Sequence, residues 1–209
     1  DNLDIPIIGS FLRSCGAFFI PRTFAGDADP LSSIIFGEYI KALLDRGHSI
    51  ECFIEGGRSR TGKVLQPKIG MLLRVIDWIR DKKGDVVIVP ISLTYDRIVE
   101  NDSHLEELAG APKQAEKLAN SIKSISGIIA SGVMNVTCYG RVDMCIATPF
   151  SLQDYLHASL EKMTASRKSE SMSENEIRKH LALSTGYQTL YLCNKVSVAE
   201  PAALIATIL

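Results

Sequence analysis

A short glycine-rich segment carries most of the residues that could bind an anion. It reads Phe-Ile-Glu-Gly-Gly-Arg-Ser-Arg-Thr-Gly-Lys over residues 53–63. From Glu55 to Arg74 there are five basic residues and one acidic residue, a local charge of +4 in a chain of net charge −1. Glycines let a backbone approach an anion closely, and arginine binds phosphate oxygens in bidentate geometry. The segment predicts a phosphate-binding loop; the alternative is a solvated run of charge.

The same segment nearly matches the phosphate loop of nucleoside triphosphatases. Residues 57–64 fit G-x-x-x-x-G-K, but Val64 stands where a serine or threonine hydroxyl would bind Mg²⁺. Gln66 and Pro67 delay the helix that should follow directly. The apolar run over 86–91 also lacks, at its end, the acidic residue that such enzymes use on their metal. These differences argue against a nucleotide site, and we expect neither a metal nor a cofactor.

The elements around this loop are those of an α/β fold. Runs of apolar and β-branched residues predict strands at 17–20, 50–54 and 86–91, the last of them buried on both faces. Apolar residues at helical spacing predict helices over 30–47, 69–81 and 174–194, and a further helix that starts at Ser151. We therefore expect a mixed, largely parallel sheet flanked by helices.

Length and composition indicate a globular protein. The chain has 209 residues, of which 46% are hydrophobic and 22% charged, and its near-neutral charge argues against a nucleic-acid partner. We predict one domain over 1–163, a linker or exposed loop over 164–173, and the start of a following helical region over 174–209. Because the first residue is not Met and the last ones form an apolar run, we interpret the chain as a piece of a longer protein.

Three blocks of the sequence, in this order, resemble the glycerol-3-phosphate acyltransferases. The likeness is strongest to the large bacterial membrane-bound enzymes and their mitochondrial and peroxisomal relatives. The blocks lie at 16–22, 53–68 and 89–92. The resemblance implies the fold of that family and a set of substrate-binding residues: Arg22, Glu55, Gly56, Gly57, Arg58, Ser59, Arg60, Lys68 and Pro90.

The resemblance also implies a role for several of these residues. Arg22, Arg58 and Lys68 would hold the phosphate of the acceptor, and Glu55 would bind a glycerol hydroxyl or orient the arginines. Pro90 would shape the groove for the acyl chain; the alternative is that it only ends a strand. Holding the acceptor against the acyl donor would accelerate the reaction by proximity.

One further block of the family, H-x-x-x-x-D, does not occur in the chain. None of the four histidines is followed by Asp five residues later: His48, His104, His157 and His180. In the family this histidine is the general base and the aspartate orients it. We therefore expect the pair upstream of Asp1, no catalytic residue within the chain, and no activity from these residues alone.

The resemblance implies an enzyme of phospholipid synthesis. It would transfer a fatty acyl group from acyl-CoA or acyl carrier protein to the sn-1 hydroxyl of glycerol 3-phosphate. Its partners would be these substrates and a membrane surface, at the cytoplasmic face of a bacterial inner membrane or of an organelle membrane. Two alternatives remain open: dihydroxyacetone phosphate as the acceptor, and a non-catalytic module on the same fold that binds phosphate or anionic lipid.

Overall fold

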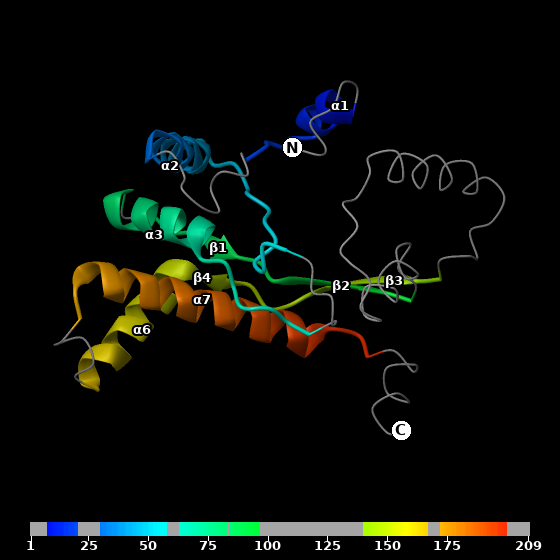
Figure 1. The fold of residues 1–209 in the computed structure, drawn as a ribbon. Helices are drawn as coiled ribbons and strands as arrows, with labels where there is room; N and C mark the ends of the chain where they lie inside the picture. The colour runs from blue at the N-terminus through cyan, green and yellow to red at the C-terminus, as the bar shows by residue number, and fades with distance from the viewer. Residues whose placement is uncertain are drawn as a thin grey trace, which may run out of the picture.

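The computed structural model describes residues 8–20, 30–57, 63–82, 84–96, 140–166 and 172–199. These residues form five helices and four short strands (Figure 1). In chain order the elements are α1 (Ile8–Ser14), α2 (Pro30–Asp45), α3 (Gly70–Lys82), β1 (Val87–Ile88), β2 (Ile91–Tyr95), β3 (Val142–Ile146), β4 (Phe150–Ser151), α6 (Leu152–Ala165) and α7 (Glu174–Val196).

The predicted helices are confirmed, and local signals in the sequence set their ends. After α2, the chain turns at Gly47 with a φ of +72°, and the amide of His48 donates to the carbonyl of Leu43 at 3.0 Å. This is the usual glycine cap of a helix C-terminus. At the start of α7, Ser173 and Glu176 form a reciprocal capping box. Backbone and side-chain groups near the helix ends therefore satisfy backbone groups that would otherwise lack partners.

The prediction of a largely parallel sheet is wrong for the part of the chain that the structure describes. β1 pairs with β4 and β2 pairs with β3, and both pairings are antiparallel. The reason is that the segment over 142–151 runs back along the segment over 87–95, so that each half of one meets a half of the other. Ile91 lies opposite Ile146, and Tyr95 lies opposite Val142.

Pro90 separates the two ladders. It lies between β1 and β2, is fully buried, and accepts a hydrogen bond on its carbonyl from the amide of Ala147 at 2.9 Å. Residues 89–90 face the three residues 147–149, because Ile88 pairs with Phe150 and Ile91 with Ile146. Since proline has no N–H to donate to a ladder, an interruption with one extra residue on the facing strand is expected there.

The segment over 86–91 is not buried on both faces, contrary to the sequence prediction. Val87, Val89 and Ile91 keep 47–59% of their surface exposed. The exposed face continues along both strands, where every outward side chain is apolar: Ile91, Leu93, Tyr95, Val142, Met144 and Ile146. The β-branched run correctly indicated a strand, but no second layer covers this face within the described residues.

The predicted strands at 17–20 and 50–54 are also wrong. Both stretches are irregular, and residues 54–55 begin a turn. Apolar and aromatic residues favour a strand only where a neighbouring strand supplies hydrogen bonds, and neither stretch has such a neighbour among the residues described. The loop over 53–68 is therefore positioned by turns and by contacts with helices.

The core is built around α3, which lies between α2 and α7 (Figure 1). Its buried residues recur at helical spacing at Leu72, Val75, Ile76 and Ile79. One group packs on Ala182 of α7 and the other on Leu152 of α6. The loop leads directly into α3, so this core fixes the C-terminal end of the loop.

A buried ion pair joins α3 to α7. The guanidinium of Arg178 lies 2.7 Å from both carboxylate oxygens of Asp77, and the Asp77 side chain is only 11% exposed. The pair ties the helix that follows the loop to the long C-terminal helix.

Candidate phosphate loop and adjoining hollow

Two hydrogen bonds close the base of the glycine-rich loop. The amide of Lys68 donates to the carbonyl of Ile54 at 2.7 Å, and the amide of Leu65 donates to a carboxylate oxygen of Glu55 at 2.7 Å. The chain therefore enters the segment at residues 54–55 and leaves it at residues 65–68 at the same place. One carboxylate oxygen of Glu55 therefore helps to shape the loop, and the two roles implied for Glu55, binding a glycerol hydroxyl or orienting the arginines, stay predictions.

Gly56 and Lys68 lie in direct contact at this base. Gly56 has a φ of +61°, which favours glycine, and a Cβ there would lie 2.7 Å from Cγ of Lys68. The stem of Lys68 thus crosses the Gly56 backbone, whereas Gly57 faces open space. No acidic residue in the described ranges forms an ion pair with Lys68, so its ammonium group can receive an anion at the loop.

The basic residues of the segment divide into two groups. The guanidinium of Arg74 donates to the hydroxyl of Ser33 on α2 at 2.6 Å, so Arg74 contributes to helix packing. Lys68 lies at the loop base. Four predicted site residues lie outside the described residues: Arg22, Arg58, Ser59 and Arg60. Their substrate-binding role stays a prediction, as does that of Glu55, Gly56, Gly57, Lys68 and Pro90.

The surroundings of the loop differ from those of a nucleotide-binding loop; the delay before the following helix was predicted from Gln66 and Pro67, whereas the missing strand before the loop was not. α3 begins at Gly70, seven residues after Lys63, and no strand precedes the loop at 50–54. A nucleotide loop needs its helix N-terminus directly behind the phosphates. Within the residues that the structure describes, no cluster of His, Cys, Asp and Glu could hold a metal ion.

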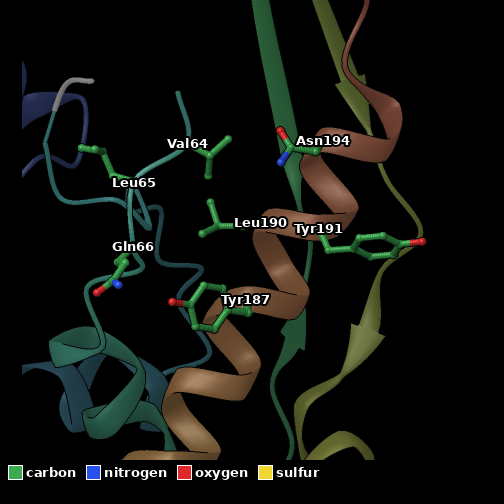
Figure 2. Close-up of a pocket in the computed structure, with 7 residues that line it drawn as sticks. All are labelled: Val64, Leu65, Gln66, Tyr187, Leu190, Tyr191 and Asn194. Atoms are coloured by element: carbon green, nitrogen blue, oxygen red, sulfur yellow. The ribbon is translucent and has the colours of Figure 1, made fainter. Parts of the chain in front are cut away.

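An open hollow of about 300 Å³ adjoins the loop. Figure 2 shows its lining, with the loop segment on one side and one face of α7 on the other. The loop contributes Val64, Leu65 and Gln66, and α7 contributes Tyr187, Leu190, Tyr191 and Asn194. Leu190 is 7% exposed, while the two tyrosines are 46% and 60% exposed.

Sequence reasoning missed the α7 side of this hollow. The signal was available, because residues 187, 190, 191 and 194 recur at the spacing of one helix face. What the sequence did not reveal is that this face lies against the loop rather than against a sheet. Pro90 lines neither this hollow nor the one between α3, α6 and α7, so its place at the interruption of the strands favours the structural reading.

Cys193 lies on the same stretch of α7 but is not activated. Its thiol donates to the carbonyl of Ile91 at 3.6 Å. Burial raises the pKa of the Cys193 thiol, and the negative charge of Glu55 acts in the same direction. A thiol whose pKa is raised stays protonated at neutral pH and is a poor nucleophile. Cys193 therefore offers no covalent chemistry beside the loop.

A glycine in the middle of α7 sets how closely this helix approaches the loop. A Cβ on Gly186 would lie 2.6 Å from Cβ and 2.8 Å from Cγ of Pro67, and Pro67 is buried. Glycine in a helix interior lowers helix stability by about 1 kcal/mol relative to alanine. We attribute its presence here to the close packing against the Pro67 ring, which leaves no room for a Cβ. Pro67 and Gly186 therefore position the end of the loop on α7.

Replacing Gly186 by alanine should destabilise the chain by about 1–2 kcal/mol, because overpacking outweighs the gain in helix propensity. Urea unfolding measures the change. Gly70→Ala is the matched control, since a Cβ at Gly70 would meet nothing within 4 Å. If Gly186→Ala is as well tolerated as Gly70→Ala, the Pro67 contact does not position the loop.

Comparison with known proteins assigns the family. A family model described as the glycerol-3-phosphate acyltransferase C-terminal region matches residues 104–209. The chain belongs to the glycerol-3-phosphate acyltransferase family. A second family model, described as acyltransferase, matches residues 1–94. The loop and α3 thus lie in the acyltransferase match, and α7 lies in the C-terminal match of the same family.

Curated relatives named glycerol-3-phosphate acyltransferase agree with this assignment. The protein of Xylella fastidiosa (strain M12) is 37% identical over 176 residues, which are 84% of this chain and 19% of the relative. That of Pseudomonas fluorescens (strain SBW25) is 39% identical over 158 residues, which are 75% of this chain and 18% of the relative. The chain therefore spans less than a fifth of the length of these relatives. No helix among the described residues is long and apolar enough to cross a membrane.

Proposed function

We propose that the intact protein transfers a fatty acyl group from acyl-CoA or acyl carrier protein to the sn-1 hydroxyl of glycerol 3-phosphate. The observation that carries the proposal is the closed basic loop over 55–68 in a chain of the glycerol-3-phosphate acyltransferase family. Gly57 faces open space, and Lys68 lies across Gly56 with its ammonium group unpaired by any described acid. A phosphate monoester matches this charge and shape.

We propose a division of roles within the loop. Arg58, Lys68 and Arg22 hold the acceptor phosphate, with Arg60 and Ser59 beside them, while Glu55 keeps the loop closed through Leu65. Gly57, which faces open space, gives the phosphate access to the backbone, while Gly56 leaves room for the stem of Lys68. Fixing the phosphate fixes the acceptor hydroxyl relative to the acyl donor, and such positioning contributes to the rate by proximity. Proton removal from that hydroxyl belongs to a His–Asp pair that this chain does not contain.

We further propose that the intact protein works at the cytoplasmic face of a membrane, in phospholipid synthesis. The support is chemical, because the product of acylating glycerol 3-phosphate is an amphiphile that partitions into a bilayer. A liposome flotation assay tests this: the intact protein should float with vesicles, and recovery of all the protein in the soluble fraction would contradict it.

Arg58→Ala in the intact protein should lower kcat/KM for glycerol 3-phosphate at least about tenfold, mainly by raising KM. The reason is the loss of a charge-assisted bond worth roughly 1.5–3 kcal/mol. Arg58→Lys should restore activity only in part, because an ammonium group cannot form the bidentate contact. Initial rates of thiol release from acyl-CoA at varied glycerol 3-phosphate give KM and kcat/KM for each variant.

Arg46→Ala is the control for this experiment, since Arg46 is an exposed arginine in the turn after α2, outside the loop. It should leave KM for the acceptor unchanged. If Arg58→Ala behaves like Arg46→Ala, Arg58 does not bind the acceptor. If dihydroxyacetone phosphate is used with a higher kcat/KM than glycerol 3-phosphate, the proposed acceptor is wrong.

A further inference from the structure

We propose that the hollow between residues 64–66 and α7 holds the acyl chain of the donor, so that Tyr187 sets the preference for chain length. This inference rests on the proposed function. It assigns a specificity role to α7, which lies in the C-terminal match of the family, whereas the acceptor loop lies in the acyltransferase match.

The requirement of the reaction supports this placement. Acyl transfer needs the acceptor hydroxyl and the thioester carbon within about 3–3.5 Å of each other. If the loop holds the acceptor phosphate, the acyl chain must begin beside the loop. The hollow shares a wall with the loop, since Val64, Leu65 and Gln66 line it. The bond from the Leu65 amide to Glu55 fixes that wall relative to the loop base.

The lining suits a hydrocarbon chain. Leu190 and the ring of Tyr187 lie on the loop side of α7 with Val64 opposite them, whereas the ring of Tyr191 extends to the other side of the helix (Figure 2). The only other polar lining groups are the uncharged amides of Gln66 and Asn194. A volume of about 300 Å³ is at the lower end of ligand pockets. Binding in a hollow of this size should therefore depend on the length of the acyl chain.

The second hollow is a weaker site for the acyl chain. It measures about 250 Å³ between α3, α6 and α7 and is also apolar. However, its rim is already neutralised, because Arg178 pairs with Asp77 and Arg80 pairs with Glu174. No residue of the loop over 53–68 lines it, whereas three loop residues line the first hollow.

The test removes the aromatic wall without touching the loop. In the intact protein, Tyr187→Ala should lower kcat/KM for hexadecanoyl-CoA about tenfold relative to octanoyl-CoA, because a long chain loses more apolar contact than a short one. KM for glycerol 3-phosphate should change less than about twofold. Tyr39→Ala is the matched control, because Tyr39 on α2 is 43% exposed and lines neither hollow.

A second measurement locates the chain directly in the unmodified protein. A hexadecanoyl-CoA carrying a diazirine near the end of its chain should label residues 187–194 or 64–66, and unlabelled hexadecanoyl-CoA should suppress the labelling. Transfer to glycerol 3-phosphate with labels elsewhere and an unshifted chain-length preference would overturn this inference alone. Absence of transfer from any acyl thioester by the intact protein would overturn the proposed function and this inference together.

Discussion

The 209 residues expressed alone should transfer acyl groups at least ~10²–10⁴-fold more slowly than a longer chain that includes an H-x-x-x-x-D block, because that is the usual cost of losing a general base. No histidine in the sequence is followed by Asp five residues later. No histidine lines the hollow beside the loop, and His157 lines the other hollow. Thiol release from acyl-CoA in the presence of glycerol 3-phosphate, with a detergent or membrane surface, measures the ratio.

Equal rates for the short and the extended chain would contradict this expectation. A histidine of the chain would then have to be the base. His48→Ala would be the first variant to make, because His48 precedes the loop most closely in sequence and is exposed in the irregular stretch after α2. Heat-inactivated extended protein provides the background rate for both measurements.

Arg178→Ala should lower the free energy of unfolding by up to about 3–5 kcal/mol, because it removes the close partner of the buried Asp77 carboxylate and leaves only Arg80, 3.9 Å away. Arg178 contacts both oxygens of Asp77 at 2.7 Å. Replacing both residues, as in Asp77→Leu/Arg178→Met, should recover much of the loss, since an apolar pair needs no charge compensation. Urea unfolding followed by circular dichroism gives the three free energies.

An exposed ion pair between neighbouring helices serves as the control. Lys82 lies 3.4 Å from Asp45, and the two side chains are 55% and 42% exposed. Lys82→Ala should therefore cost less than about 1 kcal/mol. If Arg178→Ala costs no more than Lys82→Ala, the Asp77–Arg178 pair does not hold α7 against α3.

The helices were predictable from sequence because their signals are local. Apolar residues at positions 72, 75, 76 and 79 repeat at helical spacing, and Gly47, Ser151 and Ser173 carry their capping chemistry within a few residues. Each of these signals acts through the backbone of its own helix. The helix bounds therefore follow from short windows of the sequence.

Strand pairing was not predictable in the same way. The run over 86–91 indicates extended chain, but its partner lies more than fifty residues away, and nothing in the run specifies whether that partner is parallel or antiparallel. Pro90 was the useful signal, since a residue without an N–H interrupts a ladder. Residues 50–54 were wrongly predicted as a strand for a similar reason. Apolar residues alone do not supply the neighbouring strand that a sheet needs.

The same distinction between local signals and long-range contacts applies to the candidate site. The glycines and basic residues of the loop are contiguous in sequence and could be recognised from it. The bond from Leu65 to Glu55 and the contact of Pro67 with Gly186 depend on how separated residues meet. The family resemblance stated from the loop is confirmed by the match over 104–209. The α7 wall of the hollow could not be assigned without the structure.

The central claim is that the loop over 55–68 binds the phosphate of the acceptor. Hydrogen exchange of the intact protein, followed by mass spectrometry of peptides covering 55–68, tests it most directly. Glycerol 3-phosphate and inorganic phosphate should slow exchange in this segment, glycerol should not, and ATP with Mg²⁺ should do no better than phosphate. Unchanged exchange at saturating glycerol 3-phosphate, or micromolar binding of ATP with Mg²⁺ where phosphate fails to bind, would contradict the claim.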